Sequence, residues 1–182
     1  GRAKQILTAL LAAGVAVSSL LTLAQAAEQK PYNQGLWAEY YSGDNFQTYV
    51  TGKTEQILDF QWTDSNKPLP QLGLEHFSVR FSGRIFAPET GTYDLSVNID
   101  DGAKVWLDGN LVMEDKGPHY PAVSYTQAVM EKGSYHDLVV EYYNGELGGT
   151  AQLSWKTPSG KSGIIPKENL YMPDQAAVEW KV

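Results

Sequence analysis

The sequence contains no cysteine and only three histidines among its 182 residues. Without cysteine, neither a disulfide framework nor a thiolate metal site can form. The histidines, His76, His119 and His136, form no evident set with a serine and an acid that would indicate a catalytic triad. Positive charge is also scarce, because the formal net charge is −7. Nucleic acid is therefore a poor partner, since phosphates attract Lys and Arg.

Motifs typical of enzymes are missing as well. The segment SGKSG (159–163) resembles a phosphate loop, but the glycine required six positions before Lys161 is Trp155. Two adjacent acids, Asp100 and Asp101, do not suit glycoside hydrolysis, whose two carboxylates approach the substrate from opposite sides. We therefore expect that the protein is not an enzyme.

The chain is long enough for one domain with a real core, and its 42% hydrophobic and 19% charged residues are ordinary for a folded protein. Its first 26 residues differ from the rest. Arg2 and Lys4 precede an apolar run at 6–23, and the small residues AQA follow at 24–26. This pattern predicts either a signal peptide that is removed or a retained hydrophobic segment that anchors the protein or assembles copies of it.

Hydrophobic residues alternate with polar ones along 77–86, 92–99, 134–143 and 150–156, with turn residues such as Asp108-Gly109 between these runs. A period of two indicates half-buried antiparallel strands. We therefore predict an all-β protein, an antiparallel β-sandwich with a barrel as the alternative, preceded by the N-terminal hydrophobic helical segment. Residues 164–173 read as an irregular closing segment, and residues 174–182 as a tail of unknown role.

The stretch NIDDG places Asp100 and Asp101 side by side where a strand ends. They could simply splay into a solvated turn. Alternatively, a backbone distortion could turn both carboxylates to one side, which a strong cation would favour. Ca²⁺ is the natural candidate, because it takes 6–8 oxygen ligands in irregular geometry. The segment 142–150 could supply further oxygens from Asn144, Glu146 and backbone carbonyls.

Several segments together resemble a known family. They are GLWAEYYSGDNF (35–46), DFQW (59–62), FSVRFSGRIFAPETGTYDLSVNIDDGAKVWLDGNLV (77–112), YHDLVVEYYNGELGGTAQLSW (135–155) and IIPKENLY (164–171). Their order and content are similar to the protective-antigen fourteen-kilodalton (PA-fourteen) domain. The resemblance covers residues 35–173 and implies a β-sandwich that often serves as a carbohydrate-binding module.

The resemblance also implies a metal site. In the calcium-dependent, lectin-like members, a cis peptide joins the paired aspartates, which grip Ca²⁺ together with an Asn and carbonyls of a later loop. Carried over to this sequence, Asp100, Asp101 and Asn144 are the expected ligands, and Gly145 and Glu146 are weaker candidates in the variable loop.

Sugar hydroxyls complete the metal coordination in those members. Asp100, Asp101 and Asn144 are therefore also expected to contact carbohydrate, and His119 and Tyr120 could provide rings for stacking, although core or surface packing is the alternative for such aromatics.

These observations predict an exported, calcium-dependent carbohydrate-binding domain of the adhesin or lectin type, secreted, at the cell surface or periplasmic, with glycans as partners. The alternative is a structural subunit of a surface assembly. It would use the sandwich for protein contacts and the N-terminal segment for anchoring or for a homo-oligomer or filament. Membrane contact is expected only if residues 6–23 are retained.

Overall fold

The structure is a computed structural model that describes residues 30–174. The predicted hydrophobic segment at 1–26 and the tail beyond Asp174 lie outside the described residues. Within residues 30–174, no helix is long and apolar enough to cross a membrane. The compact unit begins at Gln34.

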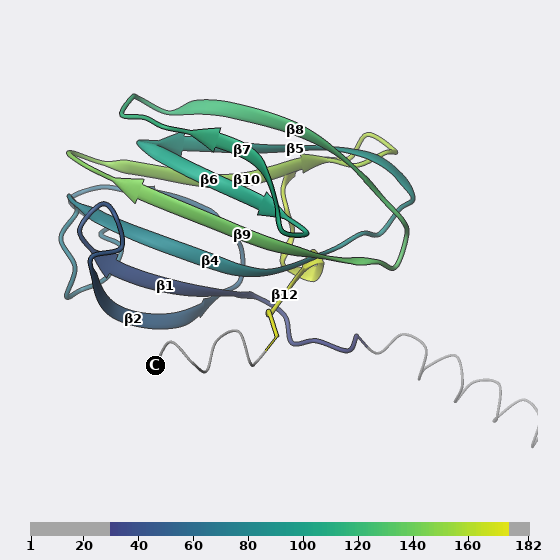
Figure 1. Cartoon of the computed structure of the whole chain (residues 1–182), viewed down its shortest axis with the longest axis horizontal. Helices are drawn as coiled ribbons and strands as arrows, with labels where there is room; N and C mark the ends of the chain where they lie inside the picture. The colour runs from purple at the N-terminus through teal and green to yellow at the C-terminus, as the bar shows by residue number, and fades with distance from the viewer. Residues whose placement is uncertain (1–29, 175–182) are drawn as a thin grey trace, which may run out of the picture. The chain divides into compact units, whose positions relative to one another are not determined.

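Seven strands form the larger sheet, in the order β2-β1-β4-β9-β6-β7, with β12 paired to β4 (Figure 1). All of its pairs are antiparallel. Its strands are β1 (Leu36–Ser42), β2 (Thr48–Glu55), β4 (Phe77–Phe86), β6 (Gly102–Leu107), β7 (Asn110–Asp115), β9 (Tyr135–Asn144) and β12 (Leu170–Tyr171).

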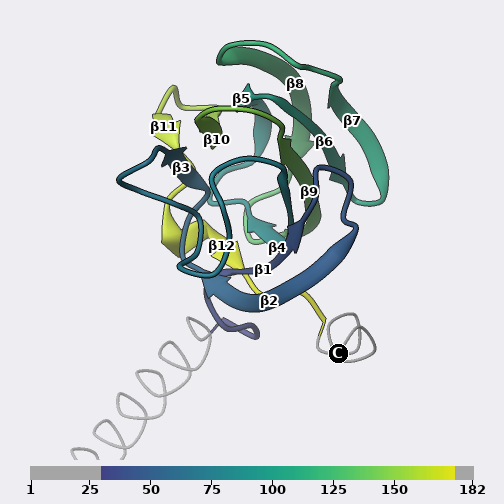
Figure 2. The same ribbon diagram turned by 90° about the vertical axis from the view of Figure 1, so that its left-hand side faces the viewer.

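The smaller sheet has five antiparallel strands in the order β11-β10-β5-β8, with β3 paired to β10. Figure 2 shows it as a second layer beside the larger sheet. Its strands are β3 (Asp59–Trp62), β5 (Gly91–Asp100), β8 (Ala122–Met130), β10 (Gly149–Lys156) and β11 (Ser162–Ile164).

One hydrophobic core draws residues from both sheets. On β5, Tyr93, Leu95, Val97 and Ile99 are buried, whereas the polar residues between them are partly exposed. The period-two pattern thus marks one buried face on β5 and β9, as predicted. The all-β antiparallel fold expected from the sequence is confirmed.

The predicted turn at Asp108-Gly109 joins β6 to β7, and both residues have positive φ, 49° and 80°. Such angles suit a two-residue hairpin turn. The closing segment is more regular than the sequence suggested. A short 3₁₀ helix, η1 (Lys167–Asn169), leads into β12, which pairs with β4. Two-residue strands carry too little alternation to be read from sequence.

Two of the connections that carry the chain from one sheet to the other lie close together. Asp100 ends β5 in the smaller sheet, and Gly102 begins β6 in the larger one. The loop from Asn144 to Gly149 crosses back, from β9 to β10. The backbone N–H of Asp101 donates to the carbonyl of Tyr143, so the two crossings are held side by side. This arrangement sets the position of the candidate site.

Candidate functional site

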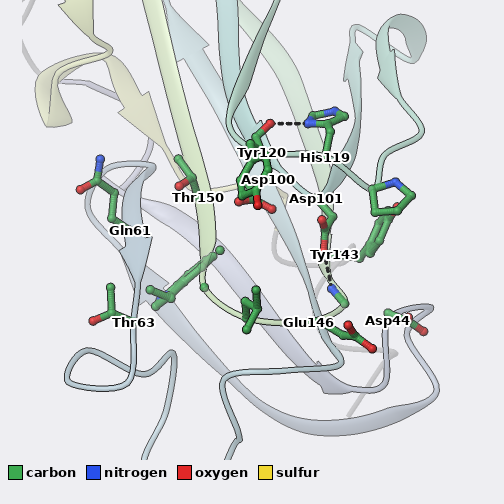
Figure 3. A pocket seen from close by; sticks show the side chains of 16 residues that line it. Asp44, Gln61, Thr63, Asp100, Asp101, His119, Tyr120, Tyr143, Glu146 and Thr150 are labelled. Carbon is green, nitrogen blue, oxygen red and sulfur yellow. Dashed lines mark hydrogen bonds between the residues drawn. The ribbon is translucent and has the colours of Figure 1, made fainter.

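A pocket of about 900 Å³ opens where these crossings meet (Figure 3). It gathers residues from segments far apart in the chain: the β1–β2 loop, the end of β3, the aspartate pair, the segment after β7 and the β9–β10 loop. Its lining residues are Asp44, Gln61, Trp62, Thr63, Asp100, Asp101, Pro118, His119, Tyr120, Tyr143, Gly145, Glu146, Leu147, Gly148, Gly149 and Thr150.

Asp100 and Asp101 are joined by a cis peptide bond, as the resemblance implied, and both line the pocket. The carbonyl of Asp100 accepts a hydrogen bond of 2.5 Å from the hydroxyl of Tyr142. Oδ2 of Asp101 accepts one of 2.7 Å from the N–H of Gly145, and Asp101 is only 7% exposed. The pair is therefore fixed by the larger sheet and by the β9–β10 loop.

The negative charges of the two carboxylates repel each other. Burial, followed by a hydrogen bond to Asp101 and the charge of Asp101, raises the pKa of Asp100 to about 6 from its ordinary value of 3.8. Two close carboxylates resist full ionisation unless positive charge is added. A divalent cation between them would supply that charge.

Asn144 does not line the pocket and is fully buried. Its amide nitrogen donates two hydrogen bonds of 2.8 Å, to the carbonyls of Leu74 and Leu147. These bonds fix the orientation of the amide. Its Oδ1 is buried and has no hydrogen-bond partner within the described residues. An unpaired buried acceptor is costly, so this oxygen is suited to receive a ligand.

The residues present fit Ca²⁺ better than a softer metal. Residues 30–174 contain no group of three or more His, Cys, Asp or Glu side chains placed to hold a metal ion. What the site offers is oxygen: two carboxylates, an amide oxygen and nearby loop carbonyls, the donor set that Ca²⁺ prefers. The carbonyl of Gly145 already accepts the N–H of His76, at 2.7 Å. Glu146 lines the pocket from the same loop.

His119 and Tyr120 lie at the pocket, as expected from the sequence. His119 is held through both ring nitrogens, by Oδ1 of Asp115 and the carbonyl of Tyr120, each at 2.6 Å. The hydrogen bond to Asp115 raises the pKa of His119. Tyr120 is 86% exposed, so its ring is available to a ligand.

Sequence reasoning missed Gln61, Thr63, Thr150 and Asp44. Gln61 pairs with Thr150, and Thr150 pairs with Asp100, so the three stand in one cross-strand row at the pocket. Strand alternation could have placed Gln61 on a polar face. The register that brings it to Asp100 depends on packing between segments almost 40 residues apart and could not be read.

A chain of hydrogen bonds elsewhere links Asp108, His136 and Ser134, with distances of 2.7 and 2.8 Å. It has the residue types of a catalytic triad. However, the Ser134 hydroxyl donates its proton to the carbonyl of Glu131, so the imidazole does not take up that proton. Asp108 also accepts the N–H of Asp137. This network fixes the β6–β7 turn.

Comparison with known proteins gives a family match. The sequence profile of the PA14 domain, the PA-fourteen domain named above, matches residues 32–169. The chain is 30% identical over 141 residues to the anti-sigma-I factor RsgI3 of Acetivibrio thermocellus. That alignment covers 77% of this chain but only 22% of the relative.

Solved structures give the same fold. A structure of an anti-sigma factor domain-containing protein has a TM-score of 0.75 and 29% identity, covering 79% of this chain and 50% of its own. The epithelial adhesin 6 A domain of Candida glabrata, solved in complex with Galβ1-3GlcNAc, has a TM-score of 0.66 and 15% identity. That match covers 81% of this chain and 90% of the adhesin chain.

Proposed function

Because the chain belongs to the PA14 domain family, we propose that it is an exported calcium-dependent carbohydrate-binding domain. The observation that carries this proposal is the buried Oδ1 of Asn144, which has no partner among residues 30–174 although its amide is fixed by two hydrogen bonds. Asn144 directly precedes Gly145, whose backbone N–H donates to Asp101.

In this proposal, Asp100 and Asp101 supply two negative charges and Asn144 supplies a neutral oxygen. A bound Ca²⁺ would offer open coordination positions to vicinal sugar hydroxyls. The chain's own part is to hold these oxygens in place before binding. Gly145 does so by donating its N–H to Asp101, and Tyr142 by donating to the Asp100 carbonyl.

The mouth of the pocket suits a sugar. Tyr120 offers an exposed ring, and Gln61 and Thr63 add polar side chains that can bond hydroxyls (Figure 3). The adhesin relative in complex with Galβ1-3GlcNAc supports a glycan as the ligand class. Adhesin-like relatives also support a location outside the cell.

Thermal unfolding with Ca²⁺ and with chelator tests the ion. An ion bound only by the folded state should stabilise it by about 2.7 kcal/mol when free Ca²⁺ is 100 times its dissociation constant. Asp101→Asn should weaken this effect strongly, because it removes charge that the ion needs. Asp94→Asn is the matched control, since Asp94 lies on β5, the strand that leads to Asp101, but does not line the pocket.

A glycan array screened under both conditions tests the sugar. Binding should disappear in chelator and return with Ca²⁺. If melting does not respond to Ca²⁺, both the metal site and the lectin mechanism are wrong. A clear response with no glycan bound would favour a structural ion in a protein-interaction module.

The relatives named as anti-sigma factors favour a second candidate, in which the domain serves a regulatory protein. This chain spans half or less of those relatives, so the pocket would then act as the ligand-binding part of a longer protein. Direct binding of this chain to a purified sigma factor in chelator would instead place the anti-sigma activity in the domain itself.

A further inference from the structure

A second hollow, of about 760 Å³, lies on the outer face of the larger sheet. Its lining residues come mainly from β1, β4, β9 and β6, which are neighbours in that sheet (Figure 1). Trp37 pairs with Ser82, Ser82 with Val139, and Val139 with Trp106. Directly opposite residues of antiparallel strands project from the same face. Two tryptophans therefore stand at the ends of one row, about 14 Å apart if three strand spacings separate them.

The surface between the two tryptophans lies lower than the indole rings, because the side chains of Ser82 and Val139 are small. Both residues line the hollow and are partly exposed. The hollow is therefore a trough that runs across the strands and has an indole at each end. Trp37 lies against Gly52 of β2, where a Cβ atom would collide with the indole ring. The absence of a side chain at Gly52 lets this ring take its position.

Ion pairs form the long sides of the trough. Arg80 donates from Nε and Nη2 to Oε2 of Glu141, at 3.1 and 2.7 Å. On the other side, Arg84 pairs with Asp137 and Asp174, at 3.4 and 2.5 Å. Because these charges neutralise one another and acids outnumber the arginines, a negatively charged ligand gains nothing here.

We propose that this trough is a second carbohydrate-binding site, which takes a neutral glycan chain of several sugar rings without calcium. Indole faces pack against the C–H faces of sugar rings, and the ordered carboxylates and guanidinium groups bond hydroxyls. The spacing of the tryptophans suits a chain that contacts both rings. Asp100, Asp101 and Asn144 lie outside this trough, so the proposal goes beyond the calcium site.

The test measures binding of neutral oligosaccharides (cello-, xylo- and galacto-oligomers) by calorimetry and tryptophan fluorescence, with the full chain in excess chelator. Binding that persists in chelator is expected. Trp37→Ala and Trp106→Ala should each weaken it by roughly tenfold or more. Ser82→Arg should weaken binding by filling the floor of the trough while both indoles remain. Gly52→Ala should weaken binding by displacing the Trp37 ring.

The controls separate the two sites. Asp101→Asn should abolish only calcium-dependent binding, and Trp106→Phe, which keeps an aromatic ring, should retain part of the calcium-independent binding. Circular dichroism and melting would confirm that each variant folds. The proposal is wrong if no neutral glycan binds in chelator, or if such binding ignores the tryptophan and Ser82 variants. It is also wrong if Ser82→Arg instead separates a dimer of the chain.

Discussion

Asn144 is a buried amide whose two ends have different surroundings. Its nitrogen satisfies two loop carbonyls, whereas its oxygen has no partner within residues 30–174. Such a residue stabilises the loop through its nitrogen and leaves its oxygen free to bind a metal ion. Its two roles can be separated by substitutions that change one end of the amide.

Asn144→Asp keeps an oxygen at the Oδ1 position and removes both N–H donors. The carbonyls of Leu74 and Leu147 would then face a carboxylate, so we expect a loss of about 2–4 kcal/mol of unfolding free energy in chelator. Added Ca²⁺ should recover part of this loss, because the new charge attracts the ion. Chemical denaturation with and without Ca²⁺ measures both effects. Equal stability of the variant and the parent in chelator would contradict the amide orientation.

Gly109 is a contrasting case, a turn residue that does not line the pocket of the aspartate pair. Its φ is 80°, and a Cβ atom there would have no neighbour within 4 Å. Gly109→Val should therefore cost about 1–2 kcal/mol through backbone conformation alone. The affinity for Ca²⁺ should stay unchanged, and calorimetry of the folded variant measures it. A selective loss of Ca²⁺ binding at normal stability would reverse the roles of the two Asp-Gly pairs.

At the scale of elements, polar side chains join turns that are far apart in the sequence. Glu89, in the β4–β5 turn, accepts hydrogen bonds of 2.9 Å from both Oγ and the N–H of Ser159, in the β10–β11 turn. The side-chain bond from Ser159, followed by one from Thr157, lowers the pKa of Glu89 below its ordinary value of 4.5. Ionisation of the Glu89 carboxyl therefore stabilises the folded state.

A depressed pKa makes this contribution pH-dependent. It is fully present above pH 4.5 and is lost as pH falls through the lower pKa of the folded state. Glu89→Gln should therefore flatten the acid side of the stability profile below pH 4.5. Glu168→Gln, which changes the net charge equally on the exposed helix η1, is the control. Melting measured from pH 7 to pH 3 would contradict the prediction if the two variants behave alike.

Local chemistry explains which elements could be predicted from the sequence. Alternating residues predicted β4, β5, β9 and β10, because buried residues alternate with partly exposed ones along part of each of these strands. The aspartate pair and Asn144 were singled out from the residues as candidates, whereas their cis geometry and ligand roles came from the family resemblance, which carries tertiary information that composition lacks. The Trp37–Trp106 row and the position of Gln61 depend on strand register. Long-range packing sets register, so these features appear only in the structure.

At the scale of the whole molecule, we expect the apolar run at 6–23 to decide assembly if it is retained. If residues 6–23 are retained, their apolar surface must be buried in lipid or in other copies. Deletion of residues 1–26 should then abolish membrane association or polymer formation, and a mature chain that starts near Ala27 should already be a monomer. Intact mass and sedimentation velocity measure this. An unchanged oligomer after the deletion would contradict the prediction.

The two ends of the compact unit meet at one place. Gln34 bridges to Tyr171, and the N–H of Gly35 donates to the carbonyl of Leu170 at 2.9 Å. The candidate-site pocket lies past the opposite end of β1, at Asp44. Tension applied between the flanking segments would therefore peel this short contact apart, one hydrogen bond at a time. The force would reach the ligand-binding end only after β12 had separated from β4. A domain tethered by its flanking segments would therefore keep its ligand bound while β12 detaches.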